Sequence, residues 1–161
     1  CRSGGENGSV EPVVLRPVGV VRHGMPLDKS VEWDRWKNRS TIEVFPEYAD
    51  GLRGLDEYSH IFVLFFLHLE KRVELLIRPR GRTDMPVVGI FASRSPVRPN
   101  PVGLAVCRLV EVSENFIHVL GLDAYTGTPV IDIKPYDYYD VVEKPKVPEW
   151  FERLWREREN V

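Results

Sequence analysis

The sequence predicts a mainly all-β fold: a small single-domain β-barrel with a C-terminal helix and few other helices. Three observations lead to this prediction. Short runs rich in Val, Ile and Phe recur along the chain, Gly, Pro, Asn or Asp bound these runs, and a helical pattern is convincing only near the C-terminus. At 161 residues the chain has the length of one domain with a hydrophobic core.

Eight runs have the composition of strands. In chain order they are residues 13–22, 41–45, 60–67, 72–78, 87–92, 104–112, 116–122 and 130–133. The stretch 61–67 is apolar throughout, so we expect it to be covered on both faces. Glu114 and Asn115 separate two runs and predict a hairpin turn. Many short strands with little helix favour a barrel or a sandwich whose edges are closed or covered.

The helical pattern lies at the C-terminus. Pro148 suits a first helical position, and one apolar stripe follows it. The stripe consists of Trp150, Phe151, Leu154 and Trp155. Glu149 and Arg153 are spaced for an ion pair on the other side. We expect residues 141–161 to form a helix that packs on the barrel domain, residues 13–140, or on a dimer partner.

Composition is that of an ordinary globular protein, with 43% hydrophobic and 29% charged residues. The longest apolar run, 61–67, is too short to cross a bilayer, so no membrane association is expected. Residues 1–11 are rich in Gly, Ser and Asn and lack the apolar region of a signal peptide. We therefore expect a flexible tail over residues 1–12 and a cytoplasmic protein.

The sequence offers no metal site. Its two cysteines, Cys1 and Cys107, form no CxxC pair, and Cys107 is expected to be a buried, inert thiol. His60 and His68 lie at opposite ends of one predicted strand, roughly 26 Å apart, too far to share a metal ion. Glycine-rich phosphate loops and the GxSxG turn of hydrolases are absent as well.

Positive charge is concentrated although the net charge is only -2. Between residues 78 and 98 stand five arginines and a single acid, Asp84. The arginines are Arg78, Arg80, Arg82, Arg94 and Arg98. Such a cluster suits a polyanionic partner or a few phosphates, and a solvated surface run is the alternative.

Residues 93–104, with the sequence SRSPVRPNPVGL, are the most unusual segment. Its three prolines preclude a regular strand or helix, because each removes an N–H and fixes φ. The segment therefore predicts a stiff loop that presents Arg94, Arg98 and Asn100 from a rigid frame. Alternatively the loop is structural, and its arginines cap carbonyl groups.

A second segment, residues 123–136, reads DAYTGTPVIDIKPY and contains a turn followed by a short strand. Alternation predicts Ile131 and Ile133 on one face, with Val130, Asp132 and Lys134 on the other. Asp132 and Lys134 then form either a surface ion pair or a site in which Lys134 orients Asp132. Taken alone, their spacing favours the ion pair.

Together these motifs resemble the TsaA-like tRNA methyltransferases, which methylate N6 of the threonylcarbamoyl-adenosine beside the anticodon. The matching strings are PVGVVR (17–22), GLDEYSHIFVLFFLH (54–68), GIFASRSPVRPNPVGL (89–104) and DAYTGTPVIDIKPY (123–136). The resemblance implies a compact β-barrel and a homodimer, with S-adenosylmethionine bound near the subunit interface. It also implies cofactor contacts at Met25, Pro26, His68, Leu69, Arg94, Leu104, Asp123, Ala124, Tyr125, Thr126 and Gly127. At residues 24–26, which occupy the place of a family cofactor loop, the family's usual proline-arginine-glutamine string is missing.

Methyl transfer to an adenine N6 needs a group that removes the proton of the acceptor nitrogen. We expect Asp132 to be this base, with Lys134 and Tyr136 orienting it or the substrate; Asp140 is the second candidate. The residues expected to bind tRNA are Arg98, Asn100, Arg78, Arg80 and Arg82. Tyr125, Tyr136, Tyr138 and Tyr139 either stack on an extruded base or pack internally. Trp33 and Trp36 are interpreted as packing residues.

Two alternative functions remain open. The same scaffold could serve a different methyl acceptor, such as another modified nucleoside or a small molecule. The chain could also be a non-catalytic module that binds S-adenosylmethionine or RNA.

Overall fold

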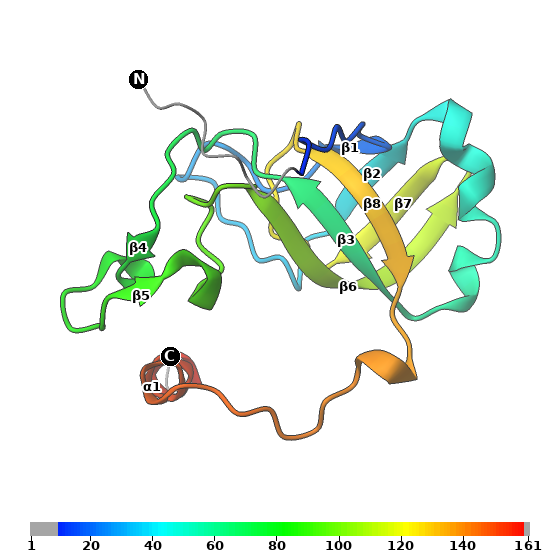
Figure 1. Cartoon of the computed structure of the whole chain (residues 1–161). Coiled ribbons are helices and arrows are strands. Elements are labelled where there is room, and N and C mark those ends of the chain that lie inside the picture. The colour runs from blue at the N-terminus through cyan, green and yellow to red at the C-terminus, as the bar shows by residue number, and fades with distance from the viewer. Residues whose placement is uncertain (1–9, 160–161) are drawn as a thin grey trace.

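Six antiparallel strands form a closed barrel in the computed structural model, which describes residues 10–159 (Figure 1). The strands are β1 (Gly19–His23), β2 (Ser40–Val44), β3 (His60–Phe66), β6 (Val102–Ser113), β7 (Phe116–Leu120) and β8 (Pro129–Pro135). They pair in the order β1-β2-β7-β6-β3-β8, and β8 returns to β1. The predicted all-β barrel is therefore confirmed, and closure pairs both edges of the sheet.

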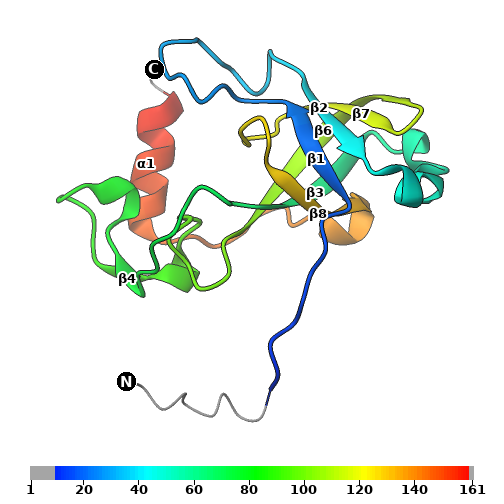
Figure 2. The ribbon, with the colours of Figure 1, turned by 90° about the horizontal axis from the view of Figure 1, so that it is seen from above.

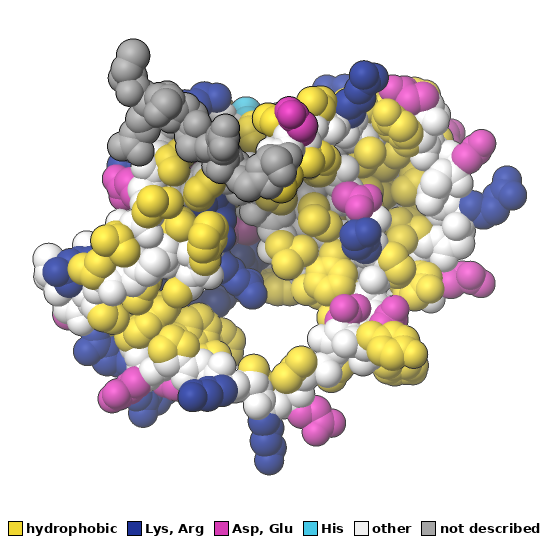
Figure 3. Space-filling view, in the orientation of Figure 1, with side chains coloured by type: hydrophobic (Ala, Val, Ile, Leu, Met, Phe, Trp, Pro, Cys, Tyr) yellow, Lys and Arg dark blue, Asp and Glu magenta, His cyan; other side chains and the backbone are white. Residues whose placement is uncertain are grey.

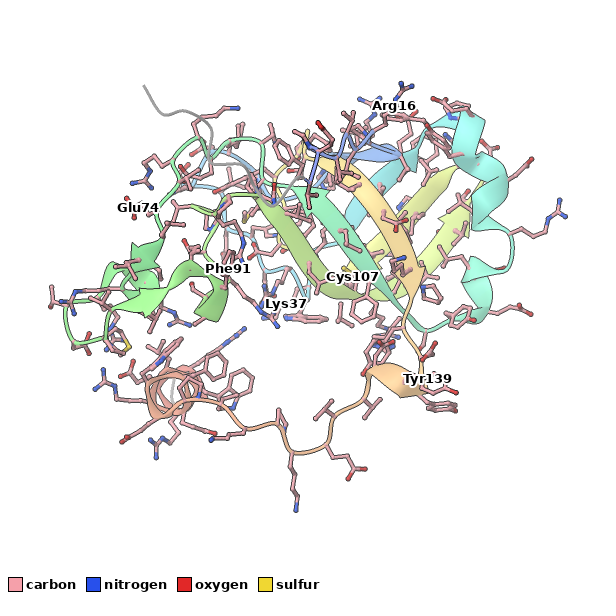
Figure 4. All side chains as sticks on the ribbon, in the orientation of Figure 1. Arg16, Lys37, Glu74, Phe91, Cys107 and Tyr139 are labelled. Atoms are coloured by element: carbon pink, nitrogen blue, oxygen red, sulfur yellow. The ribbon has the colours of Figure 1, made fainter. Side chains whose placement is uncertain are left out.

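Alternate residues of each strand fill the barrel interior. On β3, Ile61, Val63 and Phe65 are buried, and their neighbours on the same strand face outward. Cys107 of β6 lies in the same core, and its burial raises the pKa of the thiol to about 12 (Figure 4). Cys107 is thus the buried thiol that its strand-like surroundings predicted.

A β-bulge in β8 changes the predicted alternation. Leu64 pairs with Asp132, whereas the next residue, Phe65, pairs with Val130, so Ile131 has no partner on β3. Val130 is fully buried and Ile133 packs against the same core. The prediction that these two residues face opposite sides was wrong, because the extra residue shifts the period by one.

Residues 67–101, here called the arm, leave the barrel between β3 and β6 (Figures 1 and 2). The arm contains two-residue strands β4 (Leu76–Ile77) and β5 (Val88–Gly89), with the 3₁₀ helices η3 (Pro79–Gly81) and η4 (Ile90–Ala92). Strands over 72–78 and 87–92 were predicted, and both were too long. Proline donates no backbone hydrogen bond, and Pro79 and Pro86 limit the ladder on either side of the connecting turn.

Helix α1 (Glu149–Glu159) packs against the arm (Figure 2). Arg153 Nη2 donates to the backbone oxygen of Asp84 at 3.0 Å, and Arg82 Nη1 donates to Glu157 Oε2 at 2.7 Å. Leu154 is buried. The predicted C-terminal helix is confirmed, but residues 141–148 form an extended connector instead of helix. Figure 3 shows an opening between this connector and the barrel.

Other boundaries also differ from the predicted ones. β1 begins at Gly19, and the preceding residues 10–17 are exposed and lead away from the barrel (Figure 2). The predicted strand over 13–22 was too long at its start. Residues 1–9 of the predicted tail, Cys1 included, lie outside the described residues. Glu114, with φ 55°, and Asn115 form the predicted turn between β6 and β7. The 3₁₀ helices η1 (Pro46–Leu52), η2 (Leu55–Glu57) and η5 (Tyr138–Asp140) complete the fold.

Candidate functional site

A groove of about 970 Å³ lies where the barrel, the arm and the loop after β7 meet. Eight of the eleven residues expected to bind the cofactor line it. They are Met25, His68, Leu69, Arg94, Leu104, Asp123, Ala124 and Tyr125. Residues separated by a hundred positions in the chain are therefore assembled around one concavity, as a small-ligand site requires.

One wall of the groove is a turn of residues 121–127, which is hydrogen-bonded to the residues that follow β1. The N–H of Met25 donates to the Ala124 oxygen at 2.9 Å, and the N–H of Thr126 donates to the Met25 oxygen at 3.1 Å. Gly24 donates to Thr126 Oγ1 at 3.0 Å. A Cβ on Gly24 would lie 2.7 Å from the Ala124 oxygen, so only glycine permits this approach.

Pro26, Thr126 and Gly127 do not line the groove. Gly127 instead donates its N–H to the Val21 oxygen at 2.7 Å, and Val21 donates to the Thr128 oxygen at 2.9 Å. Thr126 and Gly127 thus hold the turn against β1 and the residues that follow it.

The opposite wall is the proline-rich loop. Arg98 lines the groove, yet its Nη1 donates to the Ser93 oxygen at 2.7 Å and to the Ser95 oxygen at 3.2 Å. Arg98 therefore caps carbonyl groups of its own loop, as the structural alternative required. Arg94 also lines the groove, whereas Asn100 is exposed away from it. The loop supplies at least one guanidinium, that of Arg94, to the site.

Most arm arginines are occupied in holding the arm together. Arg78 donates to the Met85 oxygen at 2.7 Å. Arg82 pairs with Asp84 at 2.6 Å and with Glu157 at 2.7 Å, and these hydrogen bonds lower the pKa of both carboxyls. Arg80 is exposed, with φ 56°. None of these three arginines lines the large groove.

The predicted catalytic residues lie elsewhere on the barrel. Asp132 lines a second groove of about 490 Å³, together with Tyr48, Arg53 and Tyr58. Lys134 Nζ is 3.3 Å from Asp132 Oδ2, so the predicted ion pair forms. The Tyr136 ring packs on Phe62, with ring centroids 5.5 Å apart.

The second candidate base, Asp140, is part of a capping box. Its Oδ2 accepts from the Asp137 N–H at 3.1 Å. Tyr138 and Tyr139 of the same turn are almost fully exposed, and Figure 4 shows Tyr139 projecting from η5. These two tyrosines are free for an external contact rather than packed internally.

An apolar face connects the two grooves on the outside of the barrel. Asp132, Leu64 and Leu104 are successive neighbours across β8, β3 and β6, and Lys134, Phe62 and Val106 form the next row. Leu104 is 55% exposed and Phe66 is 37% exposed. Hydrophobic side chains gather on the barrel surface beside the opening in Figure 3.

Arg35, Trp36 and Phe91 are among the lining residues to which sequence reasoning gave no site role. Phe91 is the last but one residue of η4 and is exposed where the arm approaches the barrel (Figure 4). Trp36, interpreted as a packing residue, is 51% exposed. Arg35 and Trp36 lie outside the motifs. Phe91 falls within the string 89–104, and its position there is the only sequence signal for any of the three.

Two classes of site are not seen in residues 10–159. Within this range no group of three or more His, Cys, Asp or Glu side chains is placed to hold a metal ion. The one α-helix described there is too short and too polar to cross a membrane.

The fold is that of a closed β-barrel protein with a groove between the barrel and an arm. Residues 21–141 match the family described as the tRNA-methyltransferase O N-terminal domain, and the chain belongs to this family.

Curated relatives and solved structures agree with this assignment. A probable S-adenosyl-L-methionine-binding protein of Methanothermobacter thermautotrophicus is 47% identical over 129 residues, which cover 79% of this chain and 91% of the relative. A putative S-adenosylmethionine-dependent methyltransferase, RcsF of Pseudomonas aeruginosa, is 38% identical over 65% of this chain and 47% of its own. The crystal structure of TrmO from P. aeruginosa superposes with a TM-score of 0.69 at 28% identity, covering 88% of this chain. The chain spans 62% of that structure's length.

Proposed function

We propose that this protein is an S-adenosylmethionine-dependent methyltransferase that methylates N6 of threonylcarbamoyl-adenosine in tRNA, in the cytoplasm. The observation that carries the proposal is the convergence of Met25, His68, Arg94 and Asp123 on one groove. These residues come from four separate parts of the chain. Residues without a common function would be expected at scattered surface positions and not around one concavity.

The groove fits the cofactor by size and by chemistry. Its volume lies near the upper end of the range for small-molecule sites, which is about 300–1,000 Å³. Apolar walls from Phe65, Leu67 and Leu104 suit a thioether chain and a purine. The Asp123 carboxylate can accept hydrogen bonds from ribose hydroxyls, and the Arg94 guanidinium suits an amino-acid carboxylate. When bound, S-adenosylmethionine supplies an activated methyl group on a good leaving group.

The chain's own residues then have to position the acceptor and take its proton. Asp132 is our proposed base, and Lys134 Nζ, 3.3 Å from its Oδ2, orients the carboxylate. In one chain, however, Asp132 lines the second groove and is two strands from Leu104. A partner subunit that brings its Asp132 to the cofactor groove would remove this separation.

We propose a homodimer whose interface is the outer face of β3, β6 and β8. Phe62, Leu64 and Phe66 make this face apolar where an outward strand face is usually polar. A two-fold axis in the interface plane, parallel to β3 and close to it, would place Asp132 of one subunit over the Leu104 side of the other. Each active site would then combine a groove from one chain with the base from its partner.

Basic side chains around the groove support a nucleic-acid substrate. Arg35, Arg94 and Arg98 all line it, and Arg108 is exposed on the adjacent strand β6. Because Arg98 also caps its own loop, we expect it to hold the loop as well as to face the tRNA. Tyr138 and Tyr139 are exposed and available to stack on an extruded base.

A non-catalytic S-adenosylmethionine-binding module is the second candidate. It is favoured by the separation of Asp132 from the cofactor groove within one chain. Another methyl acceptor on the same scaffold is a variant of the first proposal.

Calorimetric titration and nucleoside mass spectrometry together separate these functions. The purified chain should bind S-adenosylhomocysteine, and it should transfer labelled methyl to tRNA that carries threonylcarbamoyl-adenosine but not to tRNA that lacks it. Cofactor binding without methyl transfer to any RNA would favour the binding module. Transfer to both tRNAs alike would indicate a different acceptor, and absence of binding would refute the proposal.

A further inference from the structure

The loop between β1 and β2 reaches the cofactor groove through Arg35 and Trp36. The Gly121 N–H donates to the Arg35 oxygen at 2.7 Å, which ties the loop to the turn after β7. Gly121 has φ 94°, and a Cβ there would lie 2.6 Å from Cζ3 of the Trp36 ring. The glycine thus permits both the turn and the contact with the indole.

Trp36 is not simply buried by this contact. The residue is 51% exposed, and it lines the groove together with Gly121 and Asp123. An indole fixed along one edge and open on the other side is a rigid platform for a flat ring.

Arg35 lies between the indole and the carboxylate. Its Nη1 is 3.4 Å from Asp123 Oδ2, and its Cζ is 5.9 Å from the Trp36 ring centroid. The Asp123 side chain is 57% exposed, and a carboxylate offers about four acceptor positions, so the ion pair leaves room for a ligand's hydroxyl groups.

We propose that Trp36 and Arg35 bind the nucleoside end of the cofactor. The Trp36 indole stacks on the adenine ring, and Arg35 is a positioning residue that holds Asp123 where its carboxylate accepts hydrogen bonds from the ribose hydroxyls. The aromatic face of Trp36 suits the flat adenine ring, and the Asp123 carboxylate beside it suits the two neighbouring hydroxyl groups of the ribose. This inference rests on the proposed function, because it names the part of the same groove that holds adenosine.

Trp36 is tested by calorimetric titration of the full chain with S-adenosylhomocysteine and with adenosine. Trp36→Ala should raise both dissociation constants by the same factor, about 10-fold to 100-fold, as expected for a lost base–aromatic stack. Trp36→Phe should restore most of the affinity. Trp155→Phe, which alters a half-exposed tryptophan on α1, is the matched control and should change neither constant.

Arg35 needs a measurement that a purely structural role would not change. The unaltered chain should prefer adenosine to 2′,3′-dideoxyadenosine, because only adenosine carries the hydroxyl groups. Arg35→Met should reduce this preference several-fold, as should Asp123→Asn, and Arg35→Lys should recover part of it.

The outcomes distinguish this inference from the proposed function. If the unaltered chain binds S-adenosylhomocysteine and Trp36→Ala leaves its affinity unchanged, the inference is overturned and the proposed function stands. A loss of S-adenosylhomocysteine affinity without a matching loss for adenosine, or a hydroxyl preference unaffected by Arg35→Met, also overturns it. If the unaltered chain binds neither ligand, both proposals fail.

Discussion

Asp132 and Leu104 are joined by a single cross-strand row on the outside of the barrel, with Leu64 between them, yet they line different grooves. Adjacent strands are about 4.8 Å apart, so the two backbones are separated by roughly 10 Å. A carboxylate on β8 can therefore act on a ligand beside β6 only if the intervening face is bridged. The catalytic proposal depends on this relationship.

Asp132→Asn is the direct test of the base. The amide keeps the shape of the side chain but cannot accept the acceptor's proton, so turnover should fall by about 10²–10⁴-fold. The dissociation constant for S-adenosylhomocysteine should stay the same, since Asp132 is assigned to the methyl acceptor and not to the cofactor. Asp56→Asn, on the exposed helix η2, is a matched carboxylate control. Full activity in Asp132→Asn would exclude this residue as the base.

Leu64→Glu should convert the homodimer to a monomer. An unpaired charge in an apolar interface costs several kcal/mol, so the dimer affinity should fall by more than about 100-fold. Light scattering coupled to size-exclusion chromatography measures the mass directly. Leu76→Glu places the same charge on exposed β4 of the arm and should leave the mass unchanged. A Leu64→Glu protein with the mass of the unaltered one would move the interface elsewhere.

Mixing two inactive variants tests whether the site is shared between subunits. Asp132→Asn has an intact groove, and Arg94→Ala has an intact base. After subunit exchange, half of the dimers are mixed and each contains one complete site, so about a quarter of the normal activity should return. Activity would not return if each chain used its own Asp132.

Acid should loosen α1 from the arm. The pKa values of Asp84 and Glu157 are lowered in the folded protein by hydrogen bonds from Arg82, so their ion pairs stabilise the folded state at pH values above the ordinary pKa near 4. This stabilisation is lost as the pH falls below about 4 through the lowered values. Hydrogen exchange over α1, corrected for the intrinsic rate, should be faster at pH 3 than at pH 7. Asp84→Asn should produce faster exchange already at pH 7.

The barrel was predictable because it depends on local patterns that the chain repeats. The stretch 61–67 was expected to be covered on both faces; its inner residues are covered by the core, and Phe66 on its outer side is 37% exposed. This incomplete cover is the physical basis for the proposed dimer. The bulge at Ile131 could not be predicted, because Val130, Ile131 and Ile133 are equally apolar and only pairing with β3 decides which of them turn inward.

Long-range contacts limited the prediction of the site. The motifs named most of the groove, since those residues stand in the strings shared with the family. Arg35 and Trp36 stand in a loop without a motif, and only the folded contact with Gly121 and Asp123 brings them to the groove. The sequence showed that Arg78 and Arg82 belong to a basic cluster. Only the folded arm shows that Arg78 binds a carbonyl oxygen and Arg82 a carboxylate, so that both hold the arm together.

The turn 121–127 also contributes to the pairing of β1 with β8 that closes the barrel. Ligand binding at this turn should therefore stabilise the closure. The β1–β8 ladder has only two residue pairs, and the bonds from Val21 to Thr128 and from Gly127 to Val21 extend it through this turn. Such a short seam should open more readily than the rest of the sheet. A bound cofactor would stabilise the closed form of this ladder. The amide protons of Val21 and Gly127 should then exchange more slowly, while those of the β3–β6 ladder keep their rates.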